Sequence, residues 1–83
     1  MFSARFNRPV RITHHATRRM AERGMSEALL LDLIETGTVR HKDNEHAWVW
    51  REYAGRSDNL LCAAILIGPA LIVKTVMHHF MPE

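Results

Sequence analysis

Three basic side chains near the N-terminus, those of His15, Arg19 and Arg23, are spaced four residues apart. At about 100° per residue of an α-helix they fall within one narrow stripe of the helix surface. Arginine guanidiniums grip phosphate oxygens through paired hydrogen bonds, and histidine exchanges protons near neutral pH. The stripe therefore predicts a site at which two arginines hold a phosphate and His15 transfers a proton.

An alternative accounts for the arginines without a ligand. Like charges four residues apart on a helix repel each other by roughly 0.2–0.5 kcal/mol per pair. A carboxylate elsewhere in the fold, such as Glu52 or Asp32, would offset this repulsion by pairing with Arg19 or Arg23. Apolar residues border the stripe, so we expect it at a seam between helix and sheet, where either a carboxylate or a bound anion fits.

Positive charge is concentrated in the first 24 residues, which hold six arginines and one glutamate. The rest of the chain holds five basic and eight acidic residues, and the formal charge of the whole chain is +2. A local excess of positive charge attracts polyanions. The side chains expected to contact a nucleic acid are Arg11, Arg18, Arg19, Arg23 and, near the other end of the chain, Lys74.

Two short helices are expected to carry the first half of the chain. Thr13 suits the N-cap of a helix over residues 14–23, because its hydroxyl can accept a hydrogen bond from a free backbone amide. Gly24 follows, where a helix commonly ends in the left-handed conformation. Ser26 is a second N-cap, and an apolar stripe predicts a helix from there that ends before Gly37.

The pattern changes to β-structure after the second helix. Alternating or continuous apolar runs separated by turn residues predict four strands, over residues 38–42, 46–53, 60–67 and 70–77. These elements predict an α+β fold in which two N-terminal helices pack on one face of a four-stranded antiparallel sheet. Residues 10–13 alternate and could add a short strand. Residues 1–9 are expected to be an N-terminal tail or a loosely attached edge segment, and residues 10–83 a single domain.

The composition argues against several classes of protein. No apolar run reaches the roughly 18 residues that a membrane span needs, and the N-terminus lacks the apolar segment of a secretory signal. The single cysteine, Cys62, lies in an apolar run and is expected to be a buried thiol. The six histidines show no metal-ligand spacing, so neither a metal ion nor a cofactor is predicted. We expect a cytoplasmic protein with no membrane partner.

The run from Thr13 to Ser26, THHATRRMAERGMS, resembles the signature T-x-H-A-x-x-R-M-x-E-R-G-[IM]-S of the bacterial domain-of-unknown-function 4258 family. The resemblance continues through the next helix and resumes more loosely over Ile72–Val76. The expected layout is similar to that of RelE/ParE-like and BrnT-like small toxins. The resemblance implies a metal-independent ribonuclease that acts on RNA and is held in check by a cognate antitoxin or immunity protein. The residues it singles out as catalytic are His15, Arg19, Arg23 and, in the last strand, Thr75.

RNA cleavage also needs a second proton carrier. In an extended last strand, Thr75 and His79 share one face, while Lys74 and His78 share the other. Apolar neighbours on the first of these faces favour it as the one packed toward the helices. We therefore expect Thr75 and His79 to complete the catalytic group with His15.

A second hypothesis is an interaction module that binds a protein or a nucleic acid without cutting it. Trp48 and Trp50 share one strand face and could stack on nucleobases. Tryptophans at this spacing more often pack in a core or an interface, which is the reading we favour. A third hypothesis is a regulatory subunit that dimerises through a sheet edge.

Overall fold

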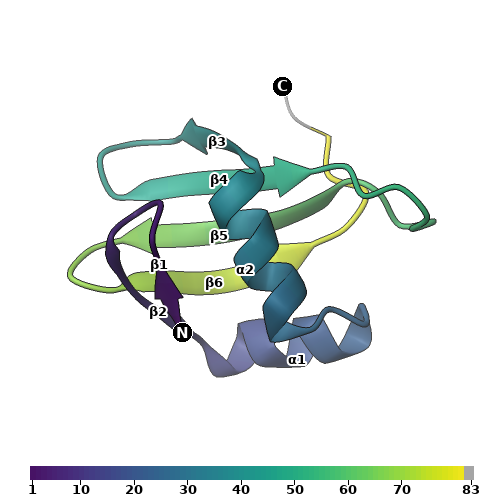
Figure 1. Cartoon of the computed structure of the whole chain (residues 1–83), viewed down its shortest axis with the longest axis horizontal. Coiled ribbons are helices and arrows are strands. Elements are labelled where there is room, and N and C mark those ends of the chain that lie inside the picture. The colour runs from purple at the N-terminus through teal and green to yellow at the C-terminus, as the bar shows by residue number, and fades with distance from the viewer. Residues whose placement is uncertain (82–83) are drawn as a thin grey trace.

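A computed structural model of the chain describes residues 1–81. It contains two helices and six strands, coloured along the chain in Figure 1. In chain order these are β1 (Phe2–Ser3), β2 (Arg8–Ile12), α1 (His14–Glu22), α2 (Glu27–Thr36), β3 (Thr38–His41), β4 (His46–Arg51), β5 (Leu61–Ile67) and β6 (Leu71–Met77).

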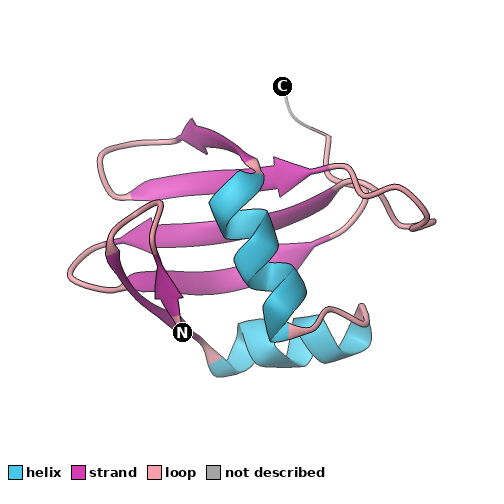
Figure 2. Ribbon diagram, viewed as in Figure 1, coloured by secondary structure: helices cyan, strands magenta, loops and turns pink. Residues whose placement is uncertain are grey.

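The strands form one mixed sheet in the order β1-β2-β6-β5-β4-β3 (Figure 2). The prediction of a four-stranded antiparallel sheet behind two N-terminal helices is therefore wrong. The antiparallel meander β3–β6 is present, but β2 adds to the free edge of β6 and runs parallel to it. Two parallel strands need a long connection between them along the chain. Here that connection consists of α1, α2 and the strands β3–β5.

Residues 1–9 form an edge segment of the sheet and not a tail, and the segment is attached more firmly than expected. β1 pairs with β2 in a hairpin, and Ser3 is fully buried. The carboxylate of Glu35 in α2 accepts hydrogen bonds from the Ser3 hydroxyl and from the backbone amides of Ala4 and Arg5, at 2.6–3.1 Å. The hairpin is thus fastened to the end of α2.

Both helices begin where their caps predict. Thr13 Oγ1 accepts from the amide of Ala16 at 3.0 Å, and Ser26 Oγ accepts from that of Leu29 at 3.1 Å. Gly24 has a φ of +62°, the left-handed conformation expected after the first helix. Within residues 1–81, neither helix is long and apolar enough to cross a membrane.

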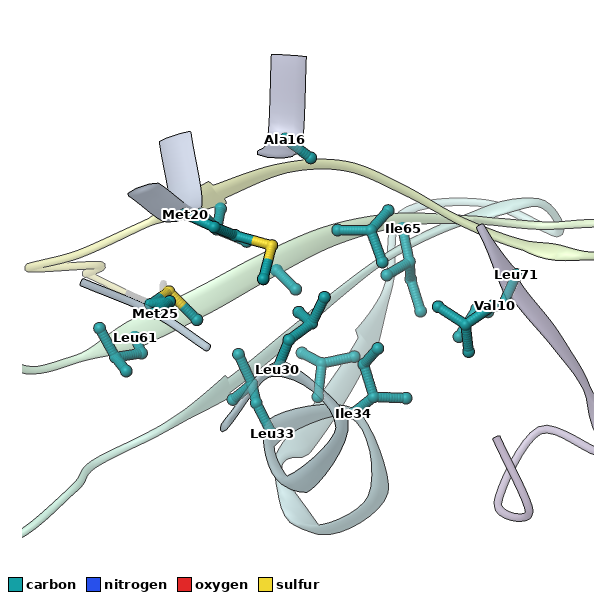
Figure 3. Close-up of a cluster of buried hydrophobic side chains, with 14 of the residues drawn as sticks. Val10, Ala16, Met20, Met25, Leu30, Leu33, Ile34, Leu61, Ile65 and Leu71 are labelled. Carbon is teal, nitrogen blue, oxygen red and sulfur yellow. The ribbon is translucent and has the colours of Figure 1, made fainter. Parts of the chain in front are cut away.

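The hydrophobic core lies between α2 and the sheet (Figure 3). α2 crosses one face of the sheet, over β4 and β5, whereas α1 lies along the edge beside β6 (Figure 1). Leu30, Leu33 and Ile34 of α2 are fully buried. Burial of each such side chain stabilises the fold by about 1.5–3 kcal/mol.

No helix of the described chain covers the opposite face of the sheet, which we call the open face. Ala47 and Val49 of β4 are buried on the helix side, so Trp48 and Trp50 between them point the other way. Cys62 is buried, as predicted, and its burial raises the thiol pKa to about 12. This thiol therefore stays protonated and unreactive near neutral pH.

Candidate nucleic-acid interface

The predicted stripe of α1 divides into two environments. His15 is exposed and lines a small hollow of about 110 Å³ with Arg18, Arg19 and Glu22. Arg19 Nη1 donates to Glu22 Oε1 at 2.9 Å, so its carboxylate partner is its own neighbour on the helix. The two side chains are 43% and 50% exposed, and pairs this exposed contribute little to stability. The stripe exists, but His15 and Arg19 stand at an open surface.

Arg23 turns away from His15 toward the loop after β4. Its side chain is only 18% exposed, and its Nε is buried without a hydrogen-bond partner among the described residues. Arg23 lines a separate hollow together with Glu22, Arg56, Asp58 and His78. Arg56 pairs with Asp58 at 2.7 Å, which lowers the Asp58 pKa to about 2, and also donates to the Arg23 carbonyl. Arg23 thus shares a hollow with His78 and not with His15. Its Nη1 also lies 3.7 Å from Glu22 Oε1, the atom that accepts from Arg19.

The last strand does not present Thr75 and His79 to the helices, and this prediction is wrong. Thr75 faces the open side of the sheet. His79 lies beyond β6 with a φ of +53°, and its Nδ1 is 3.0 Å from the Asn59 carbonyl oxygen. The predicted catalytic residues are therefore spread over three surfaces.

A β-bulge in β6 explains why the faces were misassigned. Ala64 of β5 pairs with Thr75, whereas the next residue, Ile65, pairs with Val73. Lys74 is the extra residue between them. A bulge breaks the alternation of side chains, so Lys74 and Thr75 line the same pocket on the open face, although strict alternation predicted them on opposite faces.

The pocket beside this bulge has a volume of about 180 Å³. We call it the bulge pocket. Its polar groups come from two lysines, one histidine and one threonine. The indole of Trp48 forms an apolar wall, and the small side chain of Ala64 forms the floor. The residues that line it are Lys42, His46, Ala47, Trp48, Ala64, Ile65, Lys74 and Thr75.

His46 is a pocket residue that the sequence analysis missed. The Asp43 carboxylate accepts from the amides of Glu45 and His46 at 2.8 Å and lies 2.9 Å from His46 Nδ1. These bonds, with the Glu45 amide as the largest cause, lower the Asp43 pKa to about 2. Because the ionised carboxylate only accepts, this contact favours the tautomer with the proton on Nδ1, which leaves Nε2 as the acceptor. The sequence did contain a signal for this contact, namely an aspartate three residues before a histidine in the turn after a predicted strand.

Three aromatic rings lie next to the bulge pocket. The ring of Phe80 is 6.4 Å from that of Trp48 and 5.7 Å from that of Trp50, measured between centroids. Arg40 and Met81 join Trp48 and Phe80 around a second hollow. Of the favoured interpretation of the tryptophans as core or interface residues, the core under a helix is wrong, because both are partly exposed on the open face. A role in an interface stays a prediction.

The sheet carries positive charge and no negative charge. Within residues 1–81, none of the six strands contains an aspartate or glutamate. Arg11 on β2, Arg40 on β3 and Lys74 on β6 lie on the open face, and Lys42 follows directly after β3. The described acidic residues lie on helices, turns and loops. The same part of the chain contains no group of three side chains arranged as metal ligands.

A comparison with protein-family models identifies the family to which the chain belongs. Residues 12–78, from the end of β2 to just beyond β6, match the model of DUF4258, a domain of unknown function. The chain belongs to the DUF4258 family. The match includes both helices and β3–β6 with the bulge, but not β1 or residues 8–11 of β2. No curated protein and no solved structure matches the chain, so the likeness of this DUF4258 domain to small toxins stays a prediction.

Proposed function

We propose that this DUF4258 domain binds RNA through the open face of its sheet. The observation that carries the proposal is the bulge, because it brings Lys74 and Thr75 beside Trp48 on a face without acidic strand residues. Proteins hold single-stranded nucleic acids in positively charged grooves lined by aromatic rings on which the bases stack. Each stacked base contributes about 1–3 kcal/mol.

The cations on the open face mark a path for the phosphates. Arg40 and Lys74 lie on β3 and β6, three strand spacings apart, which is about 14 Å. The aromatic rings and the bulge pocket lie between them, so bases can point into the sheet while phosphates follow its cations. Arg18 is exposed on α1, which packs against β6, and adds positive charge beside the sheet. A cognate antitoxin or immunity protein that covered the open face would block RNA.

We expect Lys74→Gln to weaken binding of a ten-nucleotide single-stranded RNA. The loss of one phosphate contact lowers the slope of log affinity against log salt by about 0.7. Fluorescence anisotropy of a labelled RNA at several salt concentrations measures both effects. Arg51→Gln is the matched control, because it removes the same charge from β4 where Arg51 pairs with Asp32 beneath α2. Equal losses in the two variants would contradict binding at the open face.

Cleavage of the bound RNA without a metal ion is a second candidate, and the Asp43–His46 contact favours it. His46 Nε2 would take the proton of a ribose 2′-hydroxyl, and the 2′-oxygen would form a bond to the adjacent phosphorus. The bond from phosphorus to the 5′-oxygen would break, and that oxygen would take a proton from the Lys74 ammonium. The products are a 2′,3′-cyclic phosphate and a 5′-hydroxyl. Lys42 would offset negative charge that develops on the phosphate.

The two histidine hypotheses give different outcomes for cleavage. With EDTA present, we expect wild-type protein and His15→Gln to cut an end-labelled RNA, and His46→Gln to lose at least a hundredfold in rate, the usual scale for a general base. Binding by His46→Gln, measured by anisotropy, should persist. Loss of cleavage in His15→Gln with activity kept in His46→Gln would instead identify His15, in the α1 stripe, as the catalytic histidine. Intact RNA with wild-type protein would leave a binding module.

A further inference from the structure

We infer that the bulge pocket holds one unstacked nucleobase of a single-stranded RNA, so that the domain selects single strands over duplexes. This inference rests on the proposed binding of RNA and names the form of RNA that is bound. Three features of the pocket support it: the row of residues that forms the pocket, its size and the groups at its rim.

The pocket arises from a small residue in a cross-strand row. Arg40 of β3 pairs with Trp48 of β4, which pairs with Ala64 of β5, which in turn pairs with Thr75 of β6. Ala64 has only a methyl group between the indole and the residues of the bulge. The hollow is therefore bounded by an aromatic ring on one side and by Lys74 and Thr75 on the other.

The size of the pocket limits what can enter. Its 180 Å³ is below the roughly 300–1,000 Å³ of sites that enclose drug-sized molecules. It therefore suits a single planar ring, with the sugar and the phosphate outside. A base in a duplex is stacked on both sides and cannot enter unless it is extruded, which costs a few kcal/mol.

The groups around the pocket suit a base attached to a phosphate chain. The exposed Lys42 and Lys74 can hold the flanking phosphates at the rim. Within residues 1–81, Thr75 Oγ1 makes only a long contact of 3.5 Å to the Val76 carbonyl oxygen, so its hydroxyl can still donate to or accept from a base edge. Because a hydroxyl both donates and accepts, this contact can serve either a purine or a pyrimidine.

Filling the hollow tests the inference without changing charge. We expect Ala64→Leu to reduce affinity for a ten-nucleotide single-stranded RNA by about tenfold, as loss of one stacked base does, and to leave weak duplex binding unchanged. Ala28→Leu on the exposed side of α2 is the matched control and should behave as wild type. Anisotropy measures both affinities, and circular dichroism checks the fold. If Ala64→Leu does not fold, Ala64→Val serves instead, with a smaller loss.

The outcomes separate this inference from the proposal beneath it. If wild-type protein binds neither RNA, the proposed function fails. If wild-type protein binds single strands and Ala64→Leu binds them equally well, only the pocket is overturned. The indole N–H resonance of Trp48 should shift on addition of RNA to wild-type protein but not to Ala64→Leu. Dimerisation seen by light scattering that Ala64→Leu abolishes and RNA leaves intact would instead assign the open face to a second copy.

Discussion

Glu35→Gln is expected to lower the free energy of unfolding by about 2 kcal/mol. The Glu35 carboxylate accepts hydrogen bonds from three donors of the N-terminal hairpin, one of them the fully buried Ser3 hydroxyl. The glutamine side chain keeps only one of the two acceptor oxygens, and its NH2 group would face the donors that the other oxygen had accepted from. Hydrogen bonds to a charged acceptor contribute about 1.5–3 kcal/mol each. In a domain of this size the melting temperature should fall by about 8–16 °C.

Thermal unfolding followed by circular dichroism measures this effect. Glu52→Gln is the control, because it removes an exposed carboxylate that lies outside the strands. It should change the melting temperature by no more than about 2–4 °C, the scale of a surface substitution. A melting temperature for Glu35→Gln equal to that of the control would mean that the hairpin contributes little to folding. Amide hydrogen exchange should also rise first in residues 2–12, because the carboxylate fastens them to α2.

Gly37→Ala is expected to destabilise the domain by about 3 kcal/mol, the upper range for overpacking a core. A Cβ at this position would lie 2.7 Å from the Leu33 carbonyl oxygen and from Val49 Cγ1, and 2.9 Å from the Trp50 carbonyl oxygen. Two of these atoms are backbone and cannot turn aside. The φ of −72° is open to any residue, so lack of space is the whole cause.

Denaturant unfolding gives the change in free energy for this variant. Gly68→Ala is the matched control, because its Cβ would meet nothing closer than the Ala70 carbonyl oxygen at 3.8 Å. We expect its midpoint to stay near that of wild type. A midpoint for Gly37→Ala that matches the control would show that α2 and β4 can separate at this point without cost.

The sequence predicted elements better than it predicted their neighbours. Thr13, Gly24 and Ser26 mark helix ends through local hydrogen bonds and backbone conformation, and both helices begin as expected. The partner of β2 could not be predicted, because a few alternating residues carry no information about which edge they join. The contact of Ser3 with Glu35 spans 32 positions and has no local signature.

The sequence predicted some residues of the candidate site, but not how they are brought together. Lys74 was expected to contact a nucleic acid and Thr75 to take part in catalysis, but on opposite faces of the strand. The bulge joins them on one face, and no glycine or turn residue announces it in the sequence of β6. The pairing of Arg19 with Glu22 was open to prediction, since residues three apart are neighbours on a helix.

The order of the strands also bears on how this domain avoids aggregation. A sheet grows into fibrils when an unpaired edge recruits a strand from another molecule. One edge here is β1, which is only two residues long, and its neighbour β2 contains Pro9, which has no backbone donor. The other edge, β3, carries Arg40 and His41. A short strand at one edge and a charged strand at the other therefore keep the sheet from pairing with strands of other molecules.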